Sequence, residues 1–292
     1  MTEDNADLLM ARVAKVFPDL EGLPHHILGA GFDSVALDVD GRFVFKFPRH
    51  QEAEQALLRE AALLGAIRGR LTMPLPDLVL VAGSPLFSRH HKIPGAYLLS
   101  GDYDRLDGAA RARLSYDLAL FYAEMHALDR EAMQLAGARP VKPWLPKDAI
   151  RTGAESLPAA LRDWAEEVLA AVAALPPDPH GEVFGMFDTH GWNMAFDHAA
   201  GRLNGLYDFA DSGFGPLHQD FIYPAWISAD LMARIIGAYE ARTGRAIDRR
   251  RVHFLAAQLR LSEFAEFSAA APADADTMAE EITRFAALPI PG

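Results

Sequence analysis

Residues 185–213 read GMFDTHGWNMAFDHAAGRLNGLYDFADSG, and this stretch decides the fold. Asp188 is followed five residues later by Asn193, and a Gly-containing turn then leads to Asp208 and Asp211. Phosphoryl transfer needs this layout, because one carboxylate accepts a hydroxyl proton while an oxygen ligand and a second carboxylate hold Mg²⁺. Asp and Asn are also common turn residues, so either half alone would indicate only a β-hairpin. Together, ahead of a helical C-terminal region, the two halves predict a phosphotransfer site.

The N-terminal third alternates between helix and strand patterns. Residues 6–17 have apolar spacing close to the helical period, and residues 51–67 form a second strongly helical stretch. Between them, residues 26–49 contain short β-rich runs joined by Asp40-Gly41, which is a strong hairpin signal. Residues 79–93 are expected to add two more strands. A sheet with one inserted helix is therefore predicted for residues 1–93.

A glycine-rich turn lies between the first two predicted strands, in Gly29-Ala-Gly31-Phe-Asp-Ser34. It precedes a strand rather than a helix, so it is not a dinucleotide-binding fingerprint. Such a hairpin can fold over nucleotide phosphates, with backbone N–H groups and the Ser34 hydroxyl as donors. The alternative is an ordinary tight turn.

Lys46 lies within the apolar strand RFVFKFP. Alternation places the three phenylalanines on one face and Val44 with Lys46 on the other, where a lysine needs a partner. Glu60, in the following helix, can supply that partner. A strand lysine paired with a helix glutamate positions phosphates in kinase-like sites. A lysine that extends to solvent is the alternative.

Beyond Pro94-Gly95 the composition becomes helical, with helices expected at 107–128, 157–175, 230–243 and 248–269 and an Ala-rich loop near 270. A β-rich segment followed by a helix-rich one indicates an α+β chain with two lobes. We predict a nucleotide-binding lobe at 1–93, a hinge at 94–98 and a helical lobe at 99–292. The helical lobe would carry the catalytic and metal motifs and the acceptor site.

Composition narrows the possible partners. The formal net charge is -12, which argues against nucleic acid or an anionic membrane surface as a partner. No apolar run approaches the ~18 residues of a membrane span, and the acidic N-terminus does not resemble a secretory signal. Cysteine is absent, which fits a reducing cytoplasm. We therefore expect a cytoplasmic protein, as a monomer or weak dimer, with no nucleic-acid or membrane partner.

Two further groups of polar residues, the histidines and a pair of glutamates, could bind a ligand. His90 and His91 point to opposite faces of a strand, and none of the histidines has the spacing of a zinc site. Glu263 and Glu266 are three residues apart on the last predicted helix and share a face. They could form an anionic wall for a polyamine substrate, although such a pair is more often simply solvated.

Over nearly its whole length, the chain resembles the aminoglycoside phosphotransferase family of small-molecule kinases. The family signature His-Gly-Asp-x-x-x-x-Asn, then Ile-Asp-Phe-Gly/Ala-Asp, is matched by residues 186–193 and 207–211. The phrases FVFKFPRHQEAEQALLRE and HHKIPGAYL are similar to the branch with the 2″-aminoglycoside and macrolide kinases. The resemblance implies a protein-kinase-like fold, with a β-rich N-lobe containing one helix and a mainly helical C-lobe.

The resemblance also implies roles. Asp188 would be the catalytic base, and Asn193 with Asp208 would bind Mg²⁺. Lys46 and Glu60 would form the ion pair that orients the phosphates of ATP or GTP, under the turn with Gly29, Gly31 and Ser34. The backbone from His91 to Ile93 would meet the purine, and Asp220 would be a structural aspartate.

Two residues depart from the family pattern. Met186 stands where the family has a histidine that braces the catalytic loop, and Trp192 replaces a small residue before Asn193, where a bulky ring could reshape the acceptor site. The expected activity is transfer of the γ-phosphate to a hydroxyl of an aminoglycoside-like antibiotic. A metabolic kinase for a sugar or amino alcohol, and a catalytically silent nucleotide-binding module, remain as alternatives.

Overall fold

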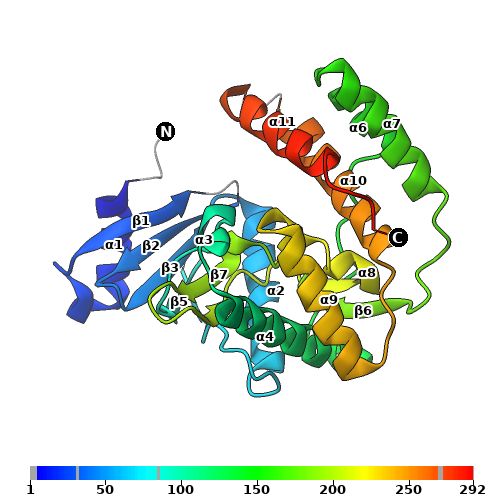
Figure 1. Cartoon of the computed structure of the whole chain (residues 1–292). Helices are drawn as coiled ribbons and strands as arrows, with labels where there is room; N and C mark the ends of the chain where they lie inside the picture. The colour runs from blue at the N-terminus through cyan, green and yellow to red at the C-terminus, as the bar shows by residue number, and fades with distance from the viewer. Residues whose placement is uncertain (1–4, 31–32, 84–85, 269–271, 292) are drawn as a thin grey trace.

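The N-terminal part of the chain is a five-stranded antiparallel sheet, which lies at the left of Figure 1. The computed structural model describes residues 5–30, 33–83, 86–268 and 272–291. The strand order is β1-β2-β3-β5-β4, so β3 and β5 are neighbours although α2 and β4 separate them in sequence. The strands are β1 (His25–Ala30), β2 (Ser34–Val39), β3 (Phe43–Pro48), β4 (Val79–Val81) and β5 (Phe87–His91).

The predicted turn between β2 and β3 is present. Asp40 and Gly41 both have positive φ, 58° and 64°, which is the backbone that a two-residue hairpin turn requires. The Asp38 carboxylate accepts the Gly41 N–H at 2.7 Å and fixes this turn.

The two faces of β3 have different neighbours, as the alternation predicts. Phe45 and Phe47 are buried in a small core with residues of α1 (Ala6–Val16). Val44 and Lys46 project from the other face, toward α2 (Gln51–Ile67) and the rest of the chain. The side chain of His50 caps α2 by accepting the Ala53 N–H, so the helix begins immediately after β3.

The remainder is mainly helical, with two short β-ladders at its centre: β6 (Glu182–Gly185) pairs with β9 (Gly213–Pro216), and β7 (Met194–Asp197) with β8 (Arg202–Leu206). The helices are α3 (Ser100–Asp104), α4 (Gly108–His126), α5 (Arg130–Leu135), α6 (Lys147–Ala154), α7 (Ala159–Ala173), α8 (Leu217–Asp220), α9 (Ala229–Thr243), α10 (Arg249–Phe267) and α11 (Pro272–Ala286). Short 3₁₀ turns are η2 (Gly191–Asn193) and η3 (Tyr223–Trp226) in this part, and η1 (Pro18–Leu20) before β1. No helix within the described residues is both long and apolar enough to cross a membrane.

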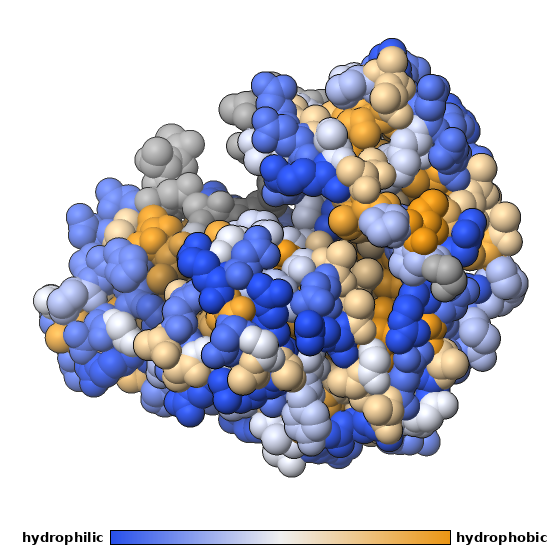
Figure 2. Space-filling model, in the orientation of Figure 1, coloured by the Kyte–Doolittle hydropathy of each residue, from blue (hydrophilic) through white to orange (hydrophobic). Residues whose placement is uncertain are grey.

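The helical elements form two groups. Helix α4 packs against α9 beneath the short ladders, whereas α6, α7, α10 and α11 pack together as a projecting arm (Figure 1). Figure 2 shows a hollow in the molecular surface between this arm and the N-terminal sheet. The stretch that carries Asp188, Asn193 and Asp208 belongs to the ladders between these parts.

The four long helices predicted beyond residue 107 are confirmed as α4, α7, α9 and α10. The prediction of a loop near 270 is wrong from residue 272 onward, because α11 begins at Pro272. Proline has a fixed φ that suits the first helical position, so a Pro-Ala-Asp sequence starts a helix as readily as it forms a loop. Residues 269–271 lie outside the described part of the chain.

A buried hydrogen-bond chain joins α4, α8 and α9 to the segment before Asp188. The Asp220 carboxylate accepts the Phe187 N–H at 2.6 Å and His126 Nε2–H at 3.0 Å. The other ring nitrogen, His126 Nδ1, accepts the Tyr239 hydroxyl at 3.0 Å. Phe187 is held at φ 56°, a conformation that is unfavourable for a bulky residue and needs such support.

Replacing His126 with leucine is expected to destabilise the fold strongly. The substitution leaves the fully buried Asp220 carboxylate without its imidazole donor, and a buried group that loses its hydrogen-bond partner costs about 1–3 kcal/mol, with more for a charged group. Urea unfolding measures the loss directly. His126→Gln, which retains a nitrogen donor, is the matched control and is expected to lose less. Equal stability of His126→Leu and the wild-type protein would contradict this role.

Candidate active site

Lys46 connects the N-terminal sheet to the stretch that follows β8. Its Nζ donates to Glu60 Oε2 at 3.2 Å and to Asp208 Oδ1 at 2.8 Å. Burial alone would lower the pKa of Lys46, but the carboxylates of Asp208 and Glu60 outweigh burial and raise it above its usual value. The predicted pairing of Lys46 with Glu60 is therefore present in the structure. Asp208 is a second partner of this lysine.

The backbone of the Asp208-Phe209 segment fixes the carboxylates of both Glu60 and Asp208. Glu60, which is 2 % exposed, also accepts the Phe209 N–H through Oε1 at 3.0 Å. Asp208 itself adopts φ 59°, a left-handed conformation that is uncommon outside glycine and asparagine. Helix α2 and the Asp208-Phe209 segment thus hold each other in place around the lysine.

A second cluster surrounds Asp188. Asn193 Nδ2 donates to the Asp188 carboxylate at 2.7 Å and to its backbone carbonyl at 2.9 Å. His190 Nε2 lies 3.2 Å from the other carboxylate oxygen. Burial would lower the pKa of His190, but the Asp188 carboxylate, and then Glu263 and Asp208, raise it. The 3₁₀ turn η2 brings these side chains together because it folds Asn193 back toward Asp188.

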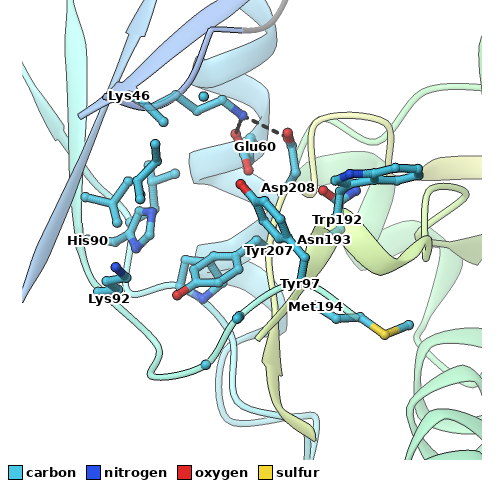
Figure 3. A pocket seen from close by; sticks show the side chains of 18 residues that line it. Lys46, Glu60, His90, Lys92, Tyr97, Trp192, Asn193, Met194, Tyr207 and Asp208 are labelled. Carbon is cyan, nitrogen blue, oxygen red and sulfur yellow. Dashed lines mark hydrogen bonds and ion pairs between the residues drawn. The ribbon is translucent and has the colours of Figure 1, made fainter. Parts of the chain in front are cut away.

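The first cluster borders a cavity of about 430 Å³, shown in Figure 3, and the second reaches this cavity through Asn193. The sheet contributes Leu28, Ala36 and Val44, and Met194 and Tyr207 line it from the short ladder β7–β8 and the residue after it. Lys46, Glu60 and Asp208 lie at one end, and His90, Lys92 and residues 95–97 border the other. An apolar slot with charged groups at one end suits a planar base attached to phosphates.

A larger cavity of about 700 Å³ continues from the charged end and shares Lys46, Glu60 and Asp208 with the first. Of the predicted glycine-rich turn, Gly29 lines both cavities and Ser34 lines the larger one. Gly31 lies outside the described residues, so its role stays a prediction. Gly29 and Ser34, two of the three residues predicted to bind phosphate from this turn, are thus adjacent to the Lys46 cluster.

Asn193 and Asp208 have oxygen atoms suited to Mg²⁺, which prefers oxygen ligands. The two hydrogen bonds that Asn193 makes to Asp188 both use Nδ2, and in the described part of the chain Oδ1 has no bonding partner. Asp208 engages Lys46 through Oδ1 only, and its side chain is 44 % exposed. Both residues line the same cavity, so the donor set fits the ion.

The residues predicted to meet the purine are close to this cavity, but their N–H groups already have partners. The Ile93 N–H donates to the Tyr207 hydroxyl at 2.6 Å, and that hydroxyl donates to the Ile93 carbonyl at 2.7 Å. The His91 N–H donates to Asp77. Tyr207 was missed because its contact with Ile93 spans 114 residues and has no local signature. The backbone contact to a purine therefore stays a prediction.

The structure separates the three acceptor-site candidates. Trp192 is 48 % exposed, borders the cavity and packs edge-on against His190 with ring centroids 5.4 Å apart. Burial raises the pKa of Glu263 to about 7, and the group interacts with His190 and Asp188. Glu266, one turn further along α10, is exposed. Of the two glutamates, Glu263 is thus the one whose charge interacts with those of His190 and Asp188.

Met186, the first departure from the family pattern, is fully buried. The Asp220 carboxylate instead receives its imidazole contact from His126, which comes from α4. The segment before Asp188 is thereby braced without a histidine at position 186. Gly185 completes the arrangement, because a Cβ there would lie 2.3 Å from Asp220 Oδ2.

Comparisons with known proteins agree with this geometry. A sequence profile of the APH phosphotransferase enzyme family matches residues 26–255. No curated protein sequence matches the chain.

Several solved structures share the fold. The GDP complex of wild-type aminoglycoside 2'-phosphotransferase-IIIa superimposes with a TM-score of 0.82 at 22 % identity, covering 97 % of this chain and 99 % of that one. Macrolide 2'-phosphotransferase MphH from Brachybacterium faecium gives 0.68 at 19 % identity, covering 98 % and 100 %. The streptomycin–ATP complex of APH(2")-IIa gives 0.65 at 17 % identity, covering 94 % and 96 %.

The profile spans most of the chain, from β1 into α10, and includes the Lys46 and Asp188 clusters. The protein-kinase-like α+β fold predicted from the sequence is confirmed by the solved structures. The chain belongs to the APH phosphotransferase enzyme family and is an enzyme of the phosphotransferase class.

Proposed function

We propose that this enzyme transfers the γ-phosphate of a nucleoside triphosphate, with Mg²⁺, to a hydroxyl group of a small molecule. The observation that carries the proposal is the convergence of two clusters on one cavity. Lys46 with Glu60 and Asp208 forms the first, and Asp188 with Asn193 the second, which reaches the cavity through Asn193. Phosphoryl transfer needs an anchored triphosphate beside a base that can reach the acceptor hydroxyl.

In this mechanism the Lys46 ammonium holds the phosphates, and its two carboxylate partners keep it in position. Asn193 and Asp208 would hold Mg²⁺, which supplies neutralisation of charge on the phosphate oxygens when bound. Asp188 orients the acceptor hydroxyl and takes its proton, while Asn193 and His190 fix the direction of its carboxylate. Catalysis then rests on positioning and electrostatics, with no covalent enzyme intermediate.

The acceptor is proposed to be an aminoglycoside-like antibiotic. Solved relatives of this fold include complexes with kanamycin, streptomycin and gentamicin. A cationic acceptor also suits the carboxylate of Glu263, whose charge interacts with that of Asp188, and the exposed ring of Trp192. We further propose the division into residues 1–93, a hinge at 94–98 and residues 99–292, in a cytoplasmic protein that is a monomer or weak dimer.

Replacing Asp188 with asparagine is expected to reduce acceptor-dependent turnover by about 10²–10⁴-fold, the usual contribution of a general base. Nucleotide affinity should change little, because Lys46 and Asp208 remain. Turnover is followed by an NADH-coupled assay with Mg²⁺, ATP or GTP, and a panel of aminoglycosides, macrolides and common metabolites. Nucleotide affinity is measured by calorimetry. An Asp188→Asn enzyme with wild-type turnover would refute the base assignment.

The same panel separates the alternatives. Turnover only with a sugar or amino alcohol would identify a metabolic kinase. Nucleotide binding without turnover on any acceptor would indicate the silent module.

Affinity for a cationic acceptor is expected to rise with pH through about 7. Burial raises the pKa of Glu263 to about 7 from an ordinary value of 4.5, so the group is mainly neutral below that pH and anionic above it. An added charge near a protein surface is worth roughly 1–4 kcal/mol toward a nearby cation. Calorimetric titration with an aminoglycoside between pH 6 and 8, an interval of about one unit around that pKa, measures the effect.

Glu263→Gln is expected to lose this pH dependence and to bind the acceptor more weakly at high pH. The exposed Glu266 gives the matched control, because Glu266→Gln leaves the half-buried Glu263 carboxylate intact. The acceptor's own amines titrate equally with every variant, so the comparison isolates the protein. The same pH dependence in wild type and Glu263→Gln would rule out this carboxylate as an acceptor ligand.

A further inference from the structure

The hydroxyl of Tyr223 is free, although its ring is buried. The side chain is only 7 % exposed, yet the hydroxyl has no hydrogen-bond partner in the described part of the chain, and it is not sealed from solvent. The other buried or half-buried tyrosines have a protein partner or are sealed: Tyr103, Tyr122, Tyr207 and Tyr239. A buried ring whose hydroxyl is open and unbonded can bind a group that the chain itself does not supply.

Tyr223 is the first residue of η3, a turn that contacts both the catalytic loop and the projecting arm. Ile227, which follows η3, packs against Gly191 of η2, where a Cβ would lie 3.3 Å from Ile227 Cγ1. Arg260 of α10 donates to the Ala225 carbonyl of η3 at 2.8 Å. The turn that carries Tyr223 is therefore held between the loop of the proposed base and the arm helix α10.

The guanidinium of Arg260 keeps this turn in place. Arg260 is 3 % exposed, and its guanidinium carbon lies 4.1 Å from the ring centroid of Trp226 in η3 and 4.1 Å from that of Phe285 in α11. Cation–π contacts are stronger when they are desolvated, as both are here. Together with the bond to Ala225, they fix η3 against the arm, so the position of the Tyr223 hydroxyl is well defined.

Four carboxylates act on the Tyr223 hydroxyl. Burial raises the pKa of Tyr223 well above its usual value, and the charges of these carboxylates raise it further: Asp188, Asp220, Asp211 and Glu263. The hydroxyl therefore keeps its proton at physiological pH. None of the four accepts that proton in a hydrogen bond, so it remains available to a ligand.

These surroundings determine what Tyr223 offers to an acceptor molecule. Ionised carboxylates only accept hydrogen bonds, so Asp188, Asp211 and Glu263 suit the hydroxyl and ammonium protons of a ligand but not its oxygen lone pairs. The Tyr223 O–H supplies a donor in this part of the site. A ligand oxygen can accept that proton, whereas an ammonium has no lone pair and cannot.

We propose that Tyr223 binds the acceptor molecule, and that its hydroxyl donates to an acceptor oxygen next to the hydroxyl that Asp188 deprotonates. The inference rests on the proposed kinase function and deepens it. The reacting hydroxyl and its neighbour have to bond to Asp188 and Tyr223 at the same time, which fixes the acceptor in one orientation. The enzyme thereby selects a hydroxyl whose neighbour on the ring is an oxygen rather than an ammonium.

The first test measures the kinetics of Tyr223→Phe with each acceptor that the wild-type enzyme phosphorylates. We expect kcat/KM for the acceptor to fall about tenfold, the effect of one hydrogen bond between neutral groups, while KM for the nucleotide is unchanged. Phenylalanine keeps the ring and removes a hydroxyl that bonds to nothing in the described chain, so thermal unfolding should show unchanged stability. Tyr116→Phe is the matched control, because Tyr116 is 54 % exposed on α4 and its variant should have wild-type kinetics.

A second measurement separates contact with the acceptor from a merely structural effect. NMR of the product identifies the phosphorylated hydroxyl, and an acceptor analogue that lacks the neighbouring oxygen is then compared with the parent compound. The wild-type enzyme should lose about tenfold in kcat/KM with this analogue. Tyr223→Phe should lose about twofold or less, because the hydrogen bond is already absent and the two changes are not additive.

Wild-type kcat/KM in folded Tyr223→Phe would overturn the proposal, and so would losses from the variant and the analogue that simply multiply. Phosphorylation of a hydroxyl with no oxygen on a neighbouring ring position would also contradict it. These outcomes leave the kinase function intact, because phosphate is still transferred. Failure of the wild-type enzyme to phosphorylate any acceptor would overturn the proposed function itself, and the role of Tyr223 with it.

Discussion

The arrangement of the site depends on one half-buried cation, the ammonium of Lys46. The Lys46 ammonium cannot remain among apolar strands without anionic partners, and it takes one from each side of the cavity: Glu60 from α2 and Asp208 from the segment after β8. This pairing fixes α2 against the sheet and holds Asp208 in its left-handed conformation. The same contact joins the N-terminal sheet to the catalytic stretch, so the cavity and its charged end form together.

A second buried group sets the position of the catalytic loop. Asp220 receives hydrogen bonds from the Phe187 N–H and from His126, and Phe187 directly precedes Asp188. Asp188, the proposed base, is therefore positioned by the helical core through Phe187 and by Asn193 through a direct hydrogen bond. The two anchors act on opposite sides of the reaction. In the proposed mechanism Lys46 would determine where the phosphates lie, and Asp220, through Phe187, would determine where the base lies.

Much of the fold could be predicted because its signals are local. Strand alternation placed Lys46 on the cavity face, the Asp40-Gly41 pair marked the hairpin, and apolar periodicity located the long helices. Contacts between distant segments could not be predicted. Asp208 joins Lys46 across 162 residues and His126 joins Asp220 across 94, and neither pair has a spacing rule. Glu263 and Glu266 are three residues apart on one helix, and only packing makes the first half-buried while the second stays exposed. Helix α11 was missed because its Pro, Ala and Asp residues are equally typical of loops.

Phosphorus-31 NMR of a complete reaction tests the central claim most directly, since it observes where the phosphate goes. The enzyme is incubated with Mg²⁺, ATP and an aminoglycoside such as kanamycin, and the spectrum is followed to completion. The account predicts a new phosphomonoester resonance on the acceptor, growing in step with ADP and absent when either enzyme or acceptor is omitted. ADP formed with inorganic phosphate alone, at a rate independent of any acceptor tried, would contradict it.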